Sequence, residues 1–134
     1  MKKATKSDIE TIKKAFIENY KDAKTELNYK NDYELLIAII LSAQCTDKRV
    51  NIITPALFEK YPSVKELSVA KLDDVKRLIN SCSFFNNKAQ NIIKMAQSVM
   101  QQYNGVIPHN QKELIKLAGV GNKTANVFMI EYKQ

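Results

Sequence analysis

Apolar residues recur every three or four positions along most of the chain, which is the period of an amphipathic helix. In residues 9–20 the pattern follows a capping box at residues 7–10, where a serine hydroxyl and a glutamate serve the free backbone N–H groups of a helix start. A longer stripe over residues 89–103 stops at Asn104-Gly105, a pair that readily takes the left-handed conformation that ends helices. Both segments are predicted to be helices.

A run of seven apolar residues, 35–41, follows Asp32, which can cap a helix. Because this run is apolar on every side, it is either a central buried helix or a buried strand. A helix is favoured, since nothing else in the chain supplies partner strands. Thr46 and Asp47 then start a further helix towards Tyr61, and Pro55 inside it predicts a kink.

The polar residues ahead of the later apolar stripes are typical of helix starts. A second capping box at residues 63–66 opens a short helix, and Asp73 or Asp74 opens the next. Asn86-Asn87 precedes the long stripe, and a short helix is predicted at about residues 110–117. With a last helix after a glycine turn, the pattern predicts an all-α helical bundle of about seven or eight helices.

The composition is that of one small folded domain. The 134 residues suffice for a single core, and 45% apolar with 26% charged residues excludes a disordered chain. The longest apolar run, residues 35–41, is far short of the ~20 residues of a membrane span. Asp8 and Glu10 interrupt what would be the apolar region of a signal peptide. We therefore expect a cytoplasmic protein without a membrane partner.

The formal net charge of +7 favours polyanionic partners, although many basic proteins bind no nucleic acid. Two cysteines, Cys45 and Cys82, are too few for a disulfide framework or a four-thiolate metal site. We expect two reduced, half-buried thiols. The single histidine excludes a histidine-rich metal site.

The turn Gly119-Val120-Gly121 carries the strongest chemical signal. Its two glycines allow positive φ and lack the Cβ atoms that would block a close ligand, while Val120 can anchor the turn in the core. Backbone N–H groups of the turn and of the following helix start can bind an anion such as a phosphate. A bare Gly-x-Gly is more often an ordinary tight turn. The preceding Leu117 and the continuation Lys123-Thr124-Ala125 extend it to a longer pattern.

With this turn the sequence resembles the helix-hairpin-helix DNA glycosylases, and among them the endonuclease III branch. The matching segments occur in order over nearly the whole chain: residues 26–27, 33–38, 41–47, 86–89 and 117–127. The resemblance implies a six-helix-barrel-type domain that ends in a helix-hairpin-helix motif. It divides the chain into an N-terminal helix and linker, 1–30, which the family packs on a C-terminal domain, and a barrel domain, 31–134, with the hairpin at about 110–132.

The resemblance implies that Lys123 is the catalytic nucleophile. The alternative is that Lys123 is a surface lysine of a basic protein, without a catalytic role. In the family this lysine attacks C1′ of a damaged nucleoside or an abasic sugar, forms a Schiff base and cuts the strand by β-elimination, which requires a neutral amine. The adenine-removing branch carries a glutamate where this chain has Ala38. The resemblance therefore favours the bifunctional branch that removes oxidised pyrimidines such as thymine glycol and cleaves abasic sites.

Two residues match positions that the family inserts into DNA. Gln44 would fill the gap left by a flipped-out base, or else would only satisfy the end of its helix. Phe84 lies near the position of the apolar wedge, although core packing is an equal alternative and the neighbouring Phe85 can be the exposed ring. The resemblance also assigns DNA-phosphate contacts to the hairpin at Gly119, Val120, Gly121 and Thr124. A monovalent cation would bind the backbone carbonyls of Ile115, Leu117 and Val120.

The chain departs from the family pattern at several positions. The family usually has a proline at the position of Ala118, and it often has an arginine at the position of Asn122. The family's essential aspartate lies roughly eighteen residues beyond the lysine, past Gln134, and after Lys123 the only acidic residue is Glu131. The four-cysteine [4Fe–4S] module is absent too. The resemblance therefore implies a truncated member with no bindable cluster.

Two functions remain in competition. The first is a monomeric, nucleoid-associated enzyme of base excision repair that acts on double-stranded DNA with a damaged base or an abasic site. The second is a catalytically silent remnant that binds DNA non-specifically and with strong salt dependence. A protein-binding helical bundle explains the charge and the hairpin least well.

Overall fold

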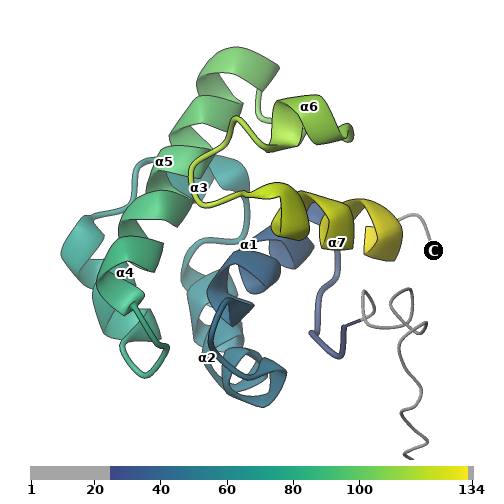
Figure 1. The fold of residues 1–134 in the computed structure, drawn as a ribbon. Coiled ribbons are helices and arrows are strands. Elements are labelled where there is room, and N and C mark those ends of the chain that lie inside the picture. The colour runs from purple at the N-terminus through teal and green to yellow at the C-terminus, as the bar shows by residue number, and fades with distance from the viewer. Residues whose placement is uncertain (1–24, 133–134) are drawn as a thin grey trace, which may run out of the picture.

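The computed structural model describes residues 25–132. This part of the chain contains seven helices and no strand, so the predicted all-α class is confirmed (Figure 1). The helices are α1 (Asp32–Ser42), α2 (Asp47–Lys60), α3 (Val64–Ser68), α4 (Leu72–Ile79), α5 (Phe85–Tyr103), α6 (Gln111–Leu114) and α7 (Asn122–Tyr132). The helix predicted at residues 9–20 lies outside the described residues. None of the described helices is long and apolar enough to cross a membrane.

Helix α1 is the centre of the fold. Every side chain from Tyr33 to Leu41 is buried, and the helix contacts α2, α5 and α7. An α-helix that is surrounded by other helices can be apolar on all sides, which explains the uniform run 35–41 and confirms a helix there. The predicted cap was wrong by one residue. Asn31 is the N-cap, its side chain accepting from the Glu34 N–H at 3.0 Å, and Asp32 is the first helical residue.

Helix α5 is the second long element, and α3 and α4 pack against it. Its apolar stripe is buried as predicted at Ala89, Ile92, Ile93, Ala96 and Val99, whereas Met100 and Tyr103 at its end are half-buried; Met95 is buried as well. The helix ends at Asn104 (φ 54°) and Gly105 (φ 81°), and the Gly105 N–H donates to the Val99 carbonyl at 3.0 Å. The predicted left-handed stop is therefore confirmed.

Several helix starts differ from the prediction. Helix α4 begins at Leu72, so Asp73 and Asp74 lie in its first turn, where their charge suits the helix dipole. Helix α5 begins at Phe85, so Asn86 and Asn87 are helical, and Phe84 rather than a polar residue precedes it. By contrast, Thr46 caps α2 as expected, accepting the Arg49 N–H at 3.1 Å.

Two further predicted starts were right in position and different in detail. Ser63 is the N-cap of α3, but its hydroxyl pairs with the Glu66 carboxylate instead of a backbone N–H. Asn110 caps α6 through the Glu113 N–H at 2.8 Å, although α6 ends at Leu114 rather than near Leu117.

The last two helices, α6 and α7, form a hairpin whose second arm crosses α1 (Figure 1). Gly119 in the turn has φ 81°, and a Cβ there would lie 3.0 Å from the Asn91 Cβ. Val120 is buried and anchors the turn, while Phe128 is completely buried in α7. The hairpin is thereby fixed against both long helices, and it presents the start of α7 to the solvent.

Candidate active site

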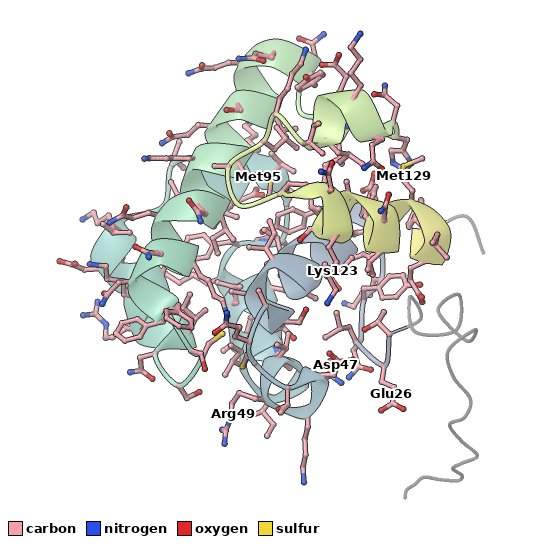
Figure 2. All side chains as sticks on the ribbon, viewed as in Figure 1. Glu26, Asp47, Arg49, Met95, Lys123 and Met129 are labelled. Atoms are coloured by element: carbon pink, nitrogen blue, oxygen red, sulfur yellow. The ribbon has the colours of Figure 1, made fainter. Side chains whose placement is uncertain are left out.

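Lys123 and Gln44, which are distant in sequence, line one cavity of about 480 Å³. The cavity lies between the end of α1, the start of α2 and the start of α7. Its walls are Thr25, Leu27, Ile39, Ser42, Ala43, Gln44, Asp47, Lys123, Thr124 and Val127. In Figure 2, Lys123 extends from α7 on the side of the molecule where Asp47 and Glu26 lie. Three of the residues selected from the sequence, Gln44, Lys123 and Thr124, are therefore brought to one site.

Lys123 is the second residue of α7 and is exposed. The first N–H groups of a helix have no partner inside it, and they carry the positive end of the helix dipole. Its neighbour Thr124 is half-buried and faces the same cavity. A primary amine beside free N–H donors can hold an anionic group and attack an electrophile next to it.

The wall opposite α7 is the segment 25–28, which two side chains of α2 hold in place. Asp47 accepts from the Thr25 hydroxyl and from the Glu26 N–H, both at 3.0 Å. Asn51 accepts the Asn28 N–H at 2.8 Å and donates to the Glu26 carbonyl at 3.0 Å. Sequence reasoning used Asp47 only as a helix start. Its position three residues after Gln44 was the signal that it would lie near the same cavity.

Gln44 is exposed and has φ 55°, which is unusual for a residue with a side chain. The alternative that it satisfies the end of α1 is not favoured, because another group does so. Lys88 of α5 donates to the Leu41 carbonyl at 2.8 Å and to the Ala43 carbonyl at 2.5 Å. Sequence reasoning missed Lys88; it stands four residues before Ile92, and thus on the apolar face of α5.

The two adjacent phenylalanines have different environments. Phe84 is 61% exposed with φ 57°, whereas Phe85 is half-buried and packs against the core. Of the two rings that the sequence left open, Phe84 is the one presented to solvent. A large exposed aromatic in a strained backbone conformation is a costly arrangement that is more common at functional sites than elsewhere.

The hairpin glycines differ in their roles. Gly119 needs its positive φ and the close approach to α5, but Gly121 does not have positive φ. A Cβ on Gly121 would meet no atom within 4 Å, so its surroundings are open space in front of the start of α7. Asn122 pairs across the hairpin with Gln111 at 3.4 Å. The absence of a side chain at Gly121 leaves room for a ligand at these N–H groups.

The predicted cation ligands, the carbonyls of Ile115, Leu117 and Val120, lie in the same turn. The Leu117 carbonyl already accepts the Val120 N–H at 3.1 Å, and a second lone pair remains on it. The assignment of these carbonyls to a cation stays a prediction from the resemblance.

Glu131, Cys45 and Cys82 are not among the residues that line the Lys123 cavity. Glu131 accepts from the Tyr29 hydroxyl at 2.9 Å through Oε2, while its Oε1 is buried without a hydrogen-bond partner among the described residues. Burial raises the pKa of the Cys82 thiol, and the neighbouring Cys45 adds to this effect. Both cysteines are free, with Cys82 buried and Cys45 half-buried, and two thiols do not fit a cluster that needs four. No group of three or more His, Cys, Asp or Glu within residues 25–132 is arranged for a metal ion.

Comparison with known proteins agrees with this geometry. Residues 37–130 match the model of the HhH-GPD superfamily of base excision DNA repair proteins. The endonuclease III of Rickettsia felis is 45% identical over 121 residues, which are 90% of this chain and 57% of that protein. The chain therefore belongs to the HhH-GPD superfamily, and the family expected from the sequence is confirmed.

Two solved structures share the fold. One is a trapped endonuclease III–DNA covalent intermediate, an estranged-adenine complex, with a TM-score of 0.77 and 45% identity; the match covers 83% of this chain and 52% of that one. The other is a non-covalent endonuclease III–DNA complex with a TM-score of 0.76, at the same identity and coverage. This chain thus spans about half the length of the relatives that it matches.

Proposed function

We propose that this chain acts in base excision repair on damaged double-stranded DNA, as a DNA glycosylase and abasic-site lyase with Lys123 as its nucleophile. The observation that carries the proposal is the shared cavity of Lys123 and Gln44. A base inside a duplex is out of reach of an amine, so the nucleotide must leave the stack and the gap must be filled. An exposed amine and an exposed amide that line the same cavity are the two groups that this task requires.

The chemistry follows from the amine. At an abasic site the open-chain sugar offers an aldehyde at C1′, which the neutral Lys123 amine attacks, losing water to form a Schiff base. The Schiff base makes the C2′ proton more acidic. When that proton is removed, the C3′–O bond breaks and the 3′ phosphate leaves. At a damaged nucleoside the same attack on C1′ expels the base. A cavity of about 480 Å³ is in the range that holds a ligand of nucleoside size.

The hairpin supplies the phosphate contacts of the proposed complex. Gly119, Val120, Gly121 and Thr124 surround the N–H groups at the start of α7, and the open space at Gly121 lets a phosphate approach them. Phe84, exposed at the start of α5, is the proposed wedge between base pairs. The net charge of +7 supports a polyanionic partner. The solved relatives bound to DNA support the same partner.

One residue of α1 supports a proposal for the lesion class. Ala38 is completely buried among apolar neighbours, at the position where the adenine-removing branch carries its glutamate. This supports oxidised pyrimidines and abasic sites as the substrates. We propose that the chain acts as a monomer on chromosomal DNA in the cytoplasm.

One observation favours the alternative, a silent DNA-binding protein. Among the described residues that line the Lys123 cavity, the only carboxylate is Asp47, and its Oδ2 already holds Thr25 and the Glu26 N–H. A carboxylate that activates the amine and stabilises charge on the sugar is part of the proposed glycosylase step. Base removal therefore depends strongly on such a carboxylate. Schiff-base formation at an abasic aldehyde depends on it less.

Borohydride trapping on a duplex with a single abasic site tests the proposal, because reduction of a Schiff base leaves a permanent covalent adduct. The expected result is an adduct band for the natural chain and for Lys94→Ala, an exposed lysine of α5, but not for Lys123→Ala. Binding that weakens with salt but gives no adduct in any variant would favour the silent alternative.

A further inference from the structure

Lys88 is a buried lysine that the proposed chemistry does not use. It is 6% exposed, and its ammonium donates to the carbonyls of Leu41 and Ala43 and lies 3.4 Å from the Cys82 sulfur. All three of its N–H donors thus have partners. The Cys82 thiol also donates to the Leu41 carbonyl at 3.2 Å, so the end of α1 and the loop before α5 meet at one point.

The cost of this arrangement suggests a function beyond packing. Burying an ammonium costs free energy, which hydrogen bonds must offset, and an apolar side chain of similar size would fill the same space without that cost. The carbonyls at the end of α1 are the negative end of its dipole and are the natural partners for a cation. Hydrogen bonds are directional, whereas apolar packing is not. The Lys88 ammonium therefore fixes the position of these carbonyls relative to α5.

The Lys88 side chain reaches both strained loops. Its ammonium binds the carbonyl of Ala43, the residue before Gln44, and it donates to the sulfur of Cys82, two residues before Phe84, at 3.4 Å. The Lys88 backbone N–H also donates to the Phe84 carbonyl at 3.0 Å, but this is an ordinary helix bond of α5 that does not depend on the side chain. Gln44 and Phe84 have φ values of 55° and 57°. Non-glycine residues keep such conformations only where their surroundings hold them.

We propose that Lys88 is a positioning residue that holds the Gln44 and Phe84 loops at a fixed separation, so that both side chains enter the duplex together at one lesion. The entry of the two side chains into DNA rests on the proposed function. The holding of the two loops rests on the Lys88 contacts alone. A pair of side chains that is pre-arranged before DNA binds loses less conformational freedom on binding. The separation of the two loops then contributes to the preference for a lesion over intact DNA.

The first test needs no DNA. Hydrogen exchange is measured on the natural chain, on Lys88→Met and on the matched control Lys94→Met. The expected result for Lys88→Met is faster exchange in residues 43–46 and in residues 81–86 together, with the hairpin at 111–124 unchanged. Unchanged exchange in either loop overturns the inference, whatever the DNA experiments give. Lys88→Gln, which keeps an amide donor, is the second variant and is expected to be intermediate.

The second test measures the ratio of affinities for an abasic-site duplex and for the same duplex intact. Lys88→Met is expected to lower this ratio about tenfold, since charged hydrogen bonds hold the loops. Its affinity for the intact duplex should stay within about twofold, because phosphate contacts dominate it. A ratio unchanged despite faster loop exchange would assign Lys88 a structural role only, and would overturn the inference.

Failure of the proposed function gives a different result. If the natural chain neither prefers the abasic duplex nor forms a borohydride adduct, the proposed function fails. The exchange experiment then still decides whether Lys88 couples the two loops.

Discussion

Three non-glycine residues among those described have left-handed backbone conformations: Gln44, Phe84 and Asn104. Asn104 follows a common helix-ending pattern, since asparagine tolerates this region. Gln44 and Phe84 have no such local reason. Both are exposed, and the Lys88 ammonium bonds a neighbour of each, the carbonyl of Ala43 and the sulfur of Cys82. At the scale of single residues, strain is therefore concentrated where the proposed function needs side chains held away from the core.

The two glycines of the hairpin allow a matched prediction. Gly119→Ala places a Cβ 3.0 Å from the Asn91 Cβ at φ 81°, and we expect it to destabilise the fold by about 1–3 kcal/mol. Gly121→Ala meets open space without positive φ, and its effect on stability should stay within about 0.5 kcal/mol. Urea unfolding measures both values. Equal destabilisation by the two substitutions would contradict the separate roles given to these glycines.

The same pair separates folding from binding. Gly121→Ala puts a methyl group where the phosphate is proposed to approach the start of α7, so we expect weaker DNA binding from a chain of unchanged stability. Binding of a duplex to Gly121→Ala, compared with the natural chain at one salt concentration, measures this effect. Full affinity would exclude a phosphate at this position.

At the scale of elements, local patterns predicted which segments are helical better than where each helix begins. Asn104-Gly105 and Thr46 follow local rules, and both predictions were confirmed. The start of α5 was missed because Phe84 is not a capping residue and makes no side-chain cap hydrogen bond. Pattern alone also cannot place the segment 25–28, because the side chains that hold it belong to α2. The resemblance predicted the site residues one by one. That Gln44 and Lys123 line the same cavity could be seen only in the folded structure.

The segment before α1 is also tied to the end of α7, through the hydrogen bond from Tyr29 to Glu131. Burial raises the pKa of Tyr29 above its usual value of 10.0, and the Glu131 carboxylate raises it further. The folded pKa is thus above the unfolded one. The protonated phenol therefore contributes stability that is fully present below pH 10 and is lost as the pH rises through the folded pKa.

Tyr29→Phe tests this link between elements. At pH 7 we expect it to lower the free energy of unfolding by about 1 kcal/mol, from the lost hydrogen bond. Above pH 10 the difference from the natural chain should shrink, since the natural chain then loses the same contribution. Urea unfolding from pH 7 to 11 measures both, and the difference between the two chains cancels the alkaline titration of the other tyrosines. A difference that grows with pH would show that the sign of the linkage is wrong.

At the scale of the whole molecule, two functions are carried by separable features. In the proposed function the net charge of +7 acts on any duplex, whereas the Lys123 cavity, Gln44 and Phe84 act on a lesion. Phosphate contacts position a protein on DNA without selecting a site, and the specific groups add selectivity. The enzyme and the silent DNA-binding protein therefore share one electrostatic surface and differ in what happens at Lys123.

The salt dependence of binding to an intact duplex measures the shared part. If the hairpin neutralises about three phosphates, the affinity should fall about 40-fold between 50 and 200 mM salt. Asn122→Arg, which restores the residue often found in the family, should add one phosphate contact and steepen the logarithmic slope by about 0.9. Lys123→Ala removes at most one contact from that slope, yet it should abolish the borohydride adduct completely. A slope that is present in the natural chain but is not steepened by Asn122→Arg would place the DNA surface elsewhere than on the hairpin, because the added charge would then neutralise no phosphate.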